Sequence, residues 1–126
     1  MGYAIGKREF GKLVEKVLKE LPPTYAEALE NVRVEVMTRP TPRMLRQTRV
    51  GRGQTLLGLY QGRPRTRRSV EDSAYLPDMI FVFQRELEAA CESEADLEVE
   101  IKKTLLHEFG HHFGLEEGDL DGLGYG

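Results

Sequence analysis

The apolar run from Met79 to Phe83 constrains the fold more than any other feature of the chain. Its five consecutive residues are apolar and mostly branched or aromatic, and they follow Asp78 without a polar interruption. Strands of this composition occur in sheets that are covered on both faces. We therefore predict a strand over Asp78–Phe83, in a sheet with other elements packed on each side.

Two further segments have the features of strands. The segment Val32–Met37 alternates apolar and charged residues, which is typical of a strand with one buried face. The segment Thr55–Tyr60 is short and apolar and has glycines on both sides, so we predict a third strand there. The stretch between these segments is rich in arginine, proline and glycine, and we interpret it as a loop.

Four segments are predicted to be helical. Lys7–Leu21 carries apolar residues at helical spacing and ends at a proline pair, and Tyr25–Leu29 follows as a short helix. Gln84–Cys91 and Asp96–Phe113 complete the set. The expected fold class is α+β, with a small mixed sheet of three to four strands packed on the N-terminal helix and on the helix over Asp96–Phe113. The length of 126 residues predicts one domain spanning residues 1–126.

Composition and cysteine content limit the class of protein. Apolar residues make up 40% of the chain and charged residues 31%, a balance typical of an ordinary globular protein. The sequence has no run with the features of a signal peptide or a membrane span, which predicts a cytoplasmic protein without a membrane partner. The single cysteine, Cys91, cannot form an intrachain disulfide, and we expect it to act as a small buried apolar residue.

The charges are unevenly distributed. Nine arginines and no acidic residue lie between Val36 and Val70, whereas fifteen acidic residues lie between Glu71 and the end. Such an arginine stretch can contact phosphates. However, no aromatic residues alternate with the arginines of the segment 39–68, as a stacking surface for bases would require. We favour a solvated loop near the acidic second half and do not expect a nucleic-acid partner.

A motif near the end of the chain carries the chemistry. His107, Glu108 and His111 form the pattern H-E-x-x-H, and all three histidines of the chain lie between positions 107 and 112. Residues four apart lie on one face of a helix, so the imidazoles of His107 and His111 can converge on one metal ion. Glu108 lies about 100° around the helix from His107, close enough to hold a metal-bound water.

The surroundings of the motif support a metal site. Leu105, Leu106, Phe109 and Phe113 fall on the helix face opposite the two histidines, so we expect the histidines to point toward a cleft. Gly114 can end the helix in a left-handed turn and bring the chain back toward the metal. Catalytic zinc usually takes three protein ligands, and no His or Cys follows His112. A downstream third ligand must therefore be an acidic residue, with four candidates: Glu116, Glu117, Asp119 and Asp121.

The stretch from Leu56 to the end resembles a small bacterial zincin-like family of zinc metallopeptidases with a minimal metzincin-like fold. The family motif reads H-E-x-x-H-x-x-G-x-x-D, and the matching segments are Leu56 to Tyr60, Leu76-Pro77-Asp78 and Leu105 to Gly114. The resemblance implies zinc as the metal and a small sheet over the active-site helix. It also implies His107 and His111 as ligands, Glu108 as general base and Glu117 as third ligand. The family has Asp where this chain has Glu117, which keeps Asp119 as an alternative.

The favoured function is a zinc-dependent hydrolysis of peptide bonds, in which Glu108 takes a proton from the attacking water. The expected partner is a peptide or protein substrate, and we expect a monomer or a small homo-oligomer. An extended substrate could pair with the edge strand over Thr55–Tyr60. In this interpretation Tyr60 packs in the core, although its hydroxyl could assist an oxyanion. His112 is expected to be a packed or supporting residue.

Two other functions remain open at this stage. One is a non-catalytic protein that keeps the metal for structure, and the other is a metal-dependent ribonuclease that uses the arginine stretch. The ribonuclease pattern ends in a third histidine that this chain lacks. A purely structural zinc needs no carboxylate beside its first histidine, so Glu108 favours the peptidase.

Overall fold

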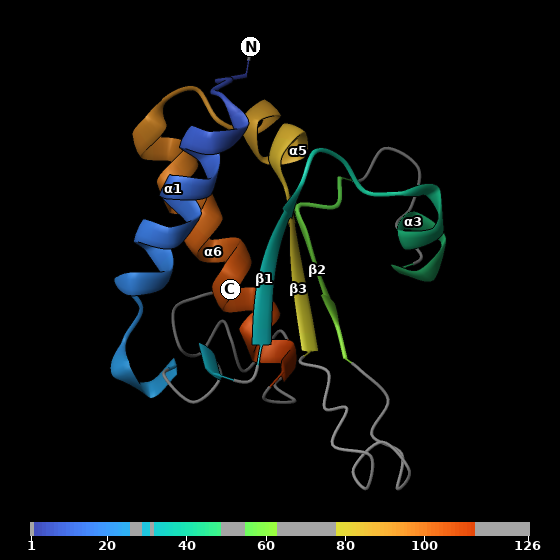
Figure 1. Cartoon of the computed structure of the whole chain (residues 1–126). Coiled ribbons are helices and arrows are strands. Elements are labelled where there is room, and N and C mark those ends of the chain that lie inside the picture. The colour runs from blue at the N-terminus through green and yellow to red at the C-terminus, as the bar shows by residue number, and fades with distance from the viewer. Residues whose placement is uncertain (1, 26–28, 31, 49–54, 63–77, 113–126) are drawn as a thin grey trace, which may run out of the picture.

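The computed structural model describes residues 2–25, 29–30, 32–48, 55–62 and 78–112. In chain order the elements are α1 (Lys7–Lys19), the 3-10 turn η1 (Pro23–Tyr25), β1 (Val32–Met37), α3 (Pro42–Thr48), β2 (Gly58–Gln61), β3 (Asp78–Phe83), α5 (Gln84–Ala89) and α6 (Glu94–His112). Figure 1 shows the strands side by side, with α1 and α6 on one side of them and α3 on the other. The predicted α+β class is confirmed.

The three described strands form a mixed sheet in the order β1-β3-β2. Strand β3 pairs in parallel with β1, where Val32 lies opposite Asp78, and antiparallel with β2, where Tyr60 lies opposite Ile80. Every residue of β3 is buried, because it has a partner strand on each side and covering elements on each face. The predicted strand over Asp78–Phe83 is confirmed, and β2 is an edge of the sheet within the described part of the chain.

The main core lies between the sheet and the two long helices. Successive residues of β3 point to opposite faces, and Ile80 and Val82 point toward α1 and α6. Each helix contributes a buried stripe at helical spacing: Phe10, Leu13, Val14 and Val17 from α1, and Leu97, Ile101, Leu105 and Phe109 from α6. This packing fixes α6 against the sheet. None of the described helices has the length and apolar character needed to cross a membrane.

The second face of the sheet has a smaller core. Met79, Phe81 and Phe83 of β3 pack there with partly buried residues that include Met44 of α3. We interpreted this region of the sequence as a loop, and that was wrong for Pro42–Thr48. The hydroxyl of Thr41 accepts the N–H of Met44 at 3.1 Å, which caps the helix, and Pro42 suits a first helical position. Periodicity missed α3 because none of its residues is buried.

Other element boundaries differ from the predictions by a few residues. The strand predicted over Thr55–Tyr60 begins at Gly58, and the final helix begins at Glu94 rather than Asp96. A 3-10 turn occupies Pro23–Tyr25, whereas residues 26–28 of the helix predicted over Tyr25–Leu29 lie outside the described residues. One described arginine of the basic segment, Arg39, pairs with Glu86 of the acidic second half at 3.1 Å.

A buried carboxylate attaches the N-terminal segment to α5. Glu88 is 3% exposed, and its Oε2 accepts the N–H of Ile5 at 2.8 Å and the side-chain amide of Gln84 at 3.1 Å. Its Oε1 accepts a hydrogen bond from Arg85 at 3.0 Å. The N–H of Tyr3 also donates to the Glu88 carbonyl at 3.1 Å. The side-chain amide of Gln84 also donates to the Ile5 carbonyl at 3.1 Å, so Glu88 and Gln84 together hold this segment on α5.

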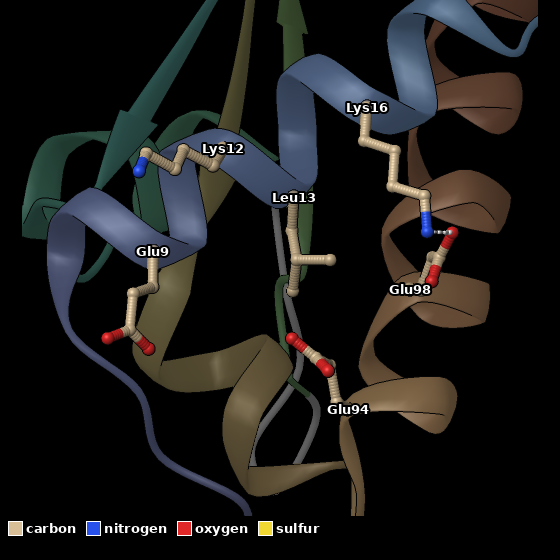
Figure 2. A pocket seen from close by; sticks show the side chains of 6 residues that line it. All are labelled: Glu9, Lys12, Leu13, Lys16, Glu94 and Glu98. Atoms are coloured by element: carbon tan, nitrogen blue, oxygen red, sulfur yellow. Dashed lines mark ion pairs between the residues drawn. The ribbon is translucent and has the colours of Figure 1, made fainter.

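A shallow charged groove lies between α1 and the first part of α6 (Figure 2). Lys16 and Glu98 pair across it at 3.1 Å, and this pair raises the pKa of Lys16 above its ordinary value. The cavity has a volume of about 340 Å³ and is lined by Glu9, Lys12, Leu13, Lys16, Glu94 and Glu98. An exposed pair of this kind contributes little to stability. The groove lies at the opposite end of α6 from His107.

Candidate metal centre

Helix α6 carries the H-E-x-x-H motif. It begins with a side-chain cap, because the hydroxyl of Ser93 accepts the N–H of Asp96 at 3.1 Å. Its buried stripe continues from Leu97 through Ile101 and Leu105, and Glu108 lies at the next position on the same side. This packing fixes the position of α6 relative to the sheet, and with it the position of the motif.

The structure places both histidines of the motif on α6. The side chain of His107 is half-buried, and His111 follows four residues later on the same helix. Leu105, Leu106 and Phe109 are fully buried, as the helical wheel predicted. The side chains of His111 and His112 lie outside the described residues, as do Phe113, Gly114 and the four acidic candidates for a third ligand.

Glu108 is almost completely buried. It is 5% exposed and faces β2 rather than an open cleft. Its Oε1 accepts the backbone N–H of Tyr60 at 3.0 Å. In the antiparallel pair of β2 with β3, this N–H points away from β3. One oxygen of the carboxylate is thus held at the outer side of the edge strand.

Gly58 allows α6 to approach β2 this closely. A Cβ at Gly58 would meet the side chain of Thr104 and the backbone carbonyl of Phe81, and would lie 3.5 Å from Cγ of Glu108. Thr104 and Glu108 are one helical turn apart, so both lean on the strand at the same point. The close approach of α6 therefore explains why the segment Leu56 to Tyr60 has a glycine at position 58.

Tyr60 has a second hydrogen bond that the sequence reasoning missed. Its hydroxyl donates to Oδ2 of Asp78 at 2.5 Å, and Asp78 is 7% exposed. Tyr60 also packs against the main core, as expected. The alternation of side chains between the two faces of a strand was the signal that could have indicated this bond. Tyr60 lies opposite Ile80, so Asp78 is its diagonal neighbour on the same face of the sheet.

The environment of Glu108 changes its protonation. Burial raises the pKa of the Glu108 carboxyl above its ordinary value, while the charge of His107 and the hydrogen bond from Tyr60 oppose that rise. A carboxylate with a raised pKa is a stronger base than an exposed glutamate. The arrangement thus favours proton acceptance by Glu108.

The described residues of the motif fit a zinc site in their chemistry. His107 supplies an imidazole and directly precedes Glu108 on α6. Zinc binds imidazole and carboxylate groups, and the motif supplies both types of side chain. No three potential ligands gather within the part of the chain that the structure describes.

Comparisons with known proteins show the family to which the chain belongs. The chain resembles the structure of a conserved hypothetical protein from Thermus thermophilus, with 25% identity and a TM-score of 0.58, over 86% of this chain and 94% of that one. No curated protein matches the chain in sequence. The sequence profile of the zincin-like metallopeptidases matches residues 29–125, which include β1, β2, β3 and the motif on α6. The chain therefore belongs to the zincin-like metallopeptidase family.

Proposed function

We propose that the protein is a zinc-dependent hydrolase that cleaves peptide bonds, with Glu108 as general base. The observation that carries the proposal is the carboxylate of Glu108, which is buried beside His107 and held through Oε1 by the N–H of Tyr60. A metal kept only for structure needs no oriented base at this position. The family match supports a peptidase over the two alternatives.

Three side chains would hold the metal. His107 and His111 are the first two, and Glu117 is the third, with Asp119 as the alternative. Bound zinc would act as a Lewis acid on the carbonyl and would make a water more acidic. Two imidazoles and one carboxylate are a common catalytic set, and they leave room for water and substrate.

Glu108 performs the proton transfers. It accepts a proton from the water as the water oxygen forms its bond to the carbonyl carbon of the peptide. It then gives that proton to the leaving nitrogen as the carbon–nitrogen bond breaks. The raised pKa of the carboxyl suits both steps, because a stronger base accepts the first proton and a neutral acid donates it again.

The substrate is a peptide in extended form along the outer edge of β2. The N–H of Tyr60 faces this edge, so the backbone groups of Gly58, two residues earlier, face the same side. Pairing with an edge strand holds the main chain of a peptide without selecting its side chains. The peptide bond is thereby brought alongside Glu108.

The test compares the parent protein with Glu108→Gln, with Glu100→Gln on the same helix as a matched control. Glu108→Gln keeps the size of the side chain but cannot accept the proton. We expect zinc content to stay nearly unchanged in both variants, and hydrolysis of short unstructured peptides to fall at least about a hundredfold in Glu108→Gln alone. Zinc content is measured by elemental analysis.

Three results would contradict the proposal. Equal peptide cleavage by the parent and Glu108→Gln would remove Glu108 from the mechanism. Zinc binding without cleavage of any peptide would favour a non-catalytic metal protein. Cleavage of a control RNA and not of peptides would favour the ribonuclease.

A further inference from the structure

We infer that Tyr60 and Asp78 are positioning residues for Glu108, an inference that rests on the proposed role of Glu108 as general base. Asp78 holds the hydroxyl of Tyr60, and the backbone N–H of the same tyrosine holds the Glu108 carboxylate. The three residues come from β3, β2 and α6, so the two hydrogen bonds connect the central strand, the edge strand and the active-site helix.

Asp78 is the polar residue of an otherwise apolar strand. It is the first residue of a strand whose other members are all apolar, and it is itself buried. Burying a carboxylate is costly unless it is hydrogen-bonded, and an apolar residue there would avoid that cost. The short hydrogen bond of 2.5 Å from the Tyr60 hydroxyl offsets part of it. This bond holds the hydroxyl of Tyr60 at the first residue of the central strand.

Tyr60 makes both hydrogen bonds, so the bond of its side chain to Asp78 can influence the bond of its backbone to Glu108. Strand β2 is only four residues long and lies at the edge of the described sheet, so its backbone has one partner strand there. Fixing the side chain of Tyr60 on Asp78 restricts the rotation of its peptide groups. The N–H that meets Oε1 of Glu108 is thereby kept in one direction.

This role predicts an effect on the chemical step rather than on substrate binding. Displacing a catalytic group by about 1 Å can cost on the order of a hundredfold in rate. We expect Tyr60→Phe and Asp78→Ala to lower kcat about 10- to 100-fold, with KM and zinc content close to those of the parent. Asp78→Asn keeps an oxygen that accepts the tyrosine hydroxyl, so it should recover most of the kcat lost in Asp78→Ala.

The matched control is Tyr25→Phe. Tyr25 is buried, whereas Tyr60 is partly buried, and the ring of Tyr25 packs against Phe109 of α6 with a centroid distance of 5.9 Å. The substitution removes a hydroxyl from a tyrosine that packs on the active-site helix, while the side chain of Glu108 and its bond to Tyr60 are retained. We expect kcat to remain that of the parent in this variant.

A measurement on the metal-free protein tests the geometry independently of activity. The backbone amide signal of residue 60 is followed by nitrogen–proton NMR, with Glu108→Ala as the reference for a lost hydrogen bond. Such a loss should move the amide proton upfield and accelerate its exchange with solvent several-fold. We expect Tyr60→Phe and Asp78→Ala to shift the signal toward the Glu108→Ala position, and Asp78→Asn to shift it less.

The two measurements separate this inference from the proposed function. A parent protein without hydrolytic activity would contradict the proposed function, while the amide signal would still report whether the hydroxyl bond positions Glu108. An unchanged amide signal in Tyr60→Phe and Asp78→Ala would overturn the inference even in an active enzyme. An equal loss of kcat in Tyr25→Phe, or a loss confined to KM, would also overturn it.

Discussion

Gly58 of β2 lies so close to Thr104 of α6 that a Cβ on the glycine would come within 2.6 Å of Cγ2 of the threonine. The backbone carbonyl of Phe81 would be 3.1 Å away. Neither neighbour moves easily, because one is a branched side chain on a packed helix and the other belongs to the central strand. The spacing between the edge strand and the active-site helix therefore depends on this glycine.

Gly58→Ala should move α6 away from β2 and weaken the contact of Glu108 with Tyr60. Overpacking of this kind costs about 1–3 kcal/mol of stability. We expect the free energy of unfolding in urea to fall by that amount, and peptide hydrolysis to fall with it. Thr104→Ser removes the methyl group that the alanine would meet, so the double variant should recover part of the loss.

Gly11→Ala is the matched control for this prediction. Gly11 lies inside α1, and a Cβ there would have nothing within 4 Å. Alanine is favoured over glycine in a helix interior by about 0.5–1 kcal/mol. A gain in stability here and a loss at position 58 would attribute the effect to crowding. A gain at both positions would show that β2 and α6 tolerate a wider spacing.

Much of the fold could be predicted because it depends on local patterns. The apolar run in β3, the alternation in β1 and the helical stripe in α1 each predict one type of element, and the structure confirms all three predictions. Helix α3 could not be found in this way, because it has no buried stripe. Its partly buried Met44 packs against the smaller core, and the side chain of Thr41 caps its start. Short capped helices without a buried stripe escape a search for periodicity.

Glu88→Ala should release the N-terminal segment from α5. The substitution leaves the N–H of Ile5 without its acceptor, while the side-chain amide of Gln84 keeps only its hydrogen bond to the Ile5 carbonyl. An unsatisfied buried polar group costs about 1–3 kcal/mol. We expect a loss of stability of at least that size in urea unfolding, with faster hydrogen exchange at the amides of Tyr3 and Ile5.

Glu86→Ala provides the comparison. Glu86 is on the same helix and pairs with Arg39, whose side chain is 68% exposed. Exposed ion pairs contribute about 0–1 kcal/mol. Similar losses in both variants would mean that Glu88 acts as an ordinary surface charge and that the N-terminal segment is held by other contacts.

Cys91 is expected to be unreactive in the folded protein. It is 1% exposed, and burial raises the pKa of its thiol above the ordinary 9.0, with nearby Glu100 and Asp96 adding to the rise. The reactive thiolate is therefore scarce at neutral pH. A thiol reagent should label the native chain at the rate of global unfolding and label the chain at once in concentrated urea. Rapid labelling without denaturant would contradict the buried position.

The same shift gives a pH dependence of stability. The native chain holds the thiol proton more tightly than the unfolded chain, so this stabilisation is complete below pH 9.0 and is lost as the pH rises through the native pKa. We expect the stability of the parent relative to Cys91→Ala to decrease over that alkaline range. A constant difference between the two proteins across the range would contradict the raised pKa.

The candidate site could be predicted only in part. His107, Glu108 and His111 follow from one motif, because four-residue spacing on a helix has a fixed geometry. The contact of Glu108 with Tyr60 joins residues 48 positions apart and depends on how closely a strand and a helix pack. No local pattern records that distance. The contact of Asp78 with Tyr60 likewise depends on the register of β2 against β3, which the sequence leaves open.

The last prediction concerns the third ligand, which we expect to be Glu117. Two histidines alone bind zinc weakly, because catalytic sites use three protein ligands. Glu117→Ala should therefore lower zinc affinity as His107→Ala does. The loss should exceed the roughly 10- to 100-fold that follows when a residue hydrogen-bonded to a zinc ligand is replaced. Glu116→Ala, which removes the neighbouring carboxylate, should leave the affinity unchanged. Competition with a zinc-binding dye measures all variants at one pH, since ligand protonation also alters affinity. A loss in Asp119→Ala with full affinity in Glu117→Ala would assign the ligand to Asp119, and the carboxylate would then be reached from two residues further along the chain.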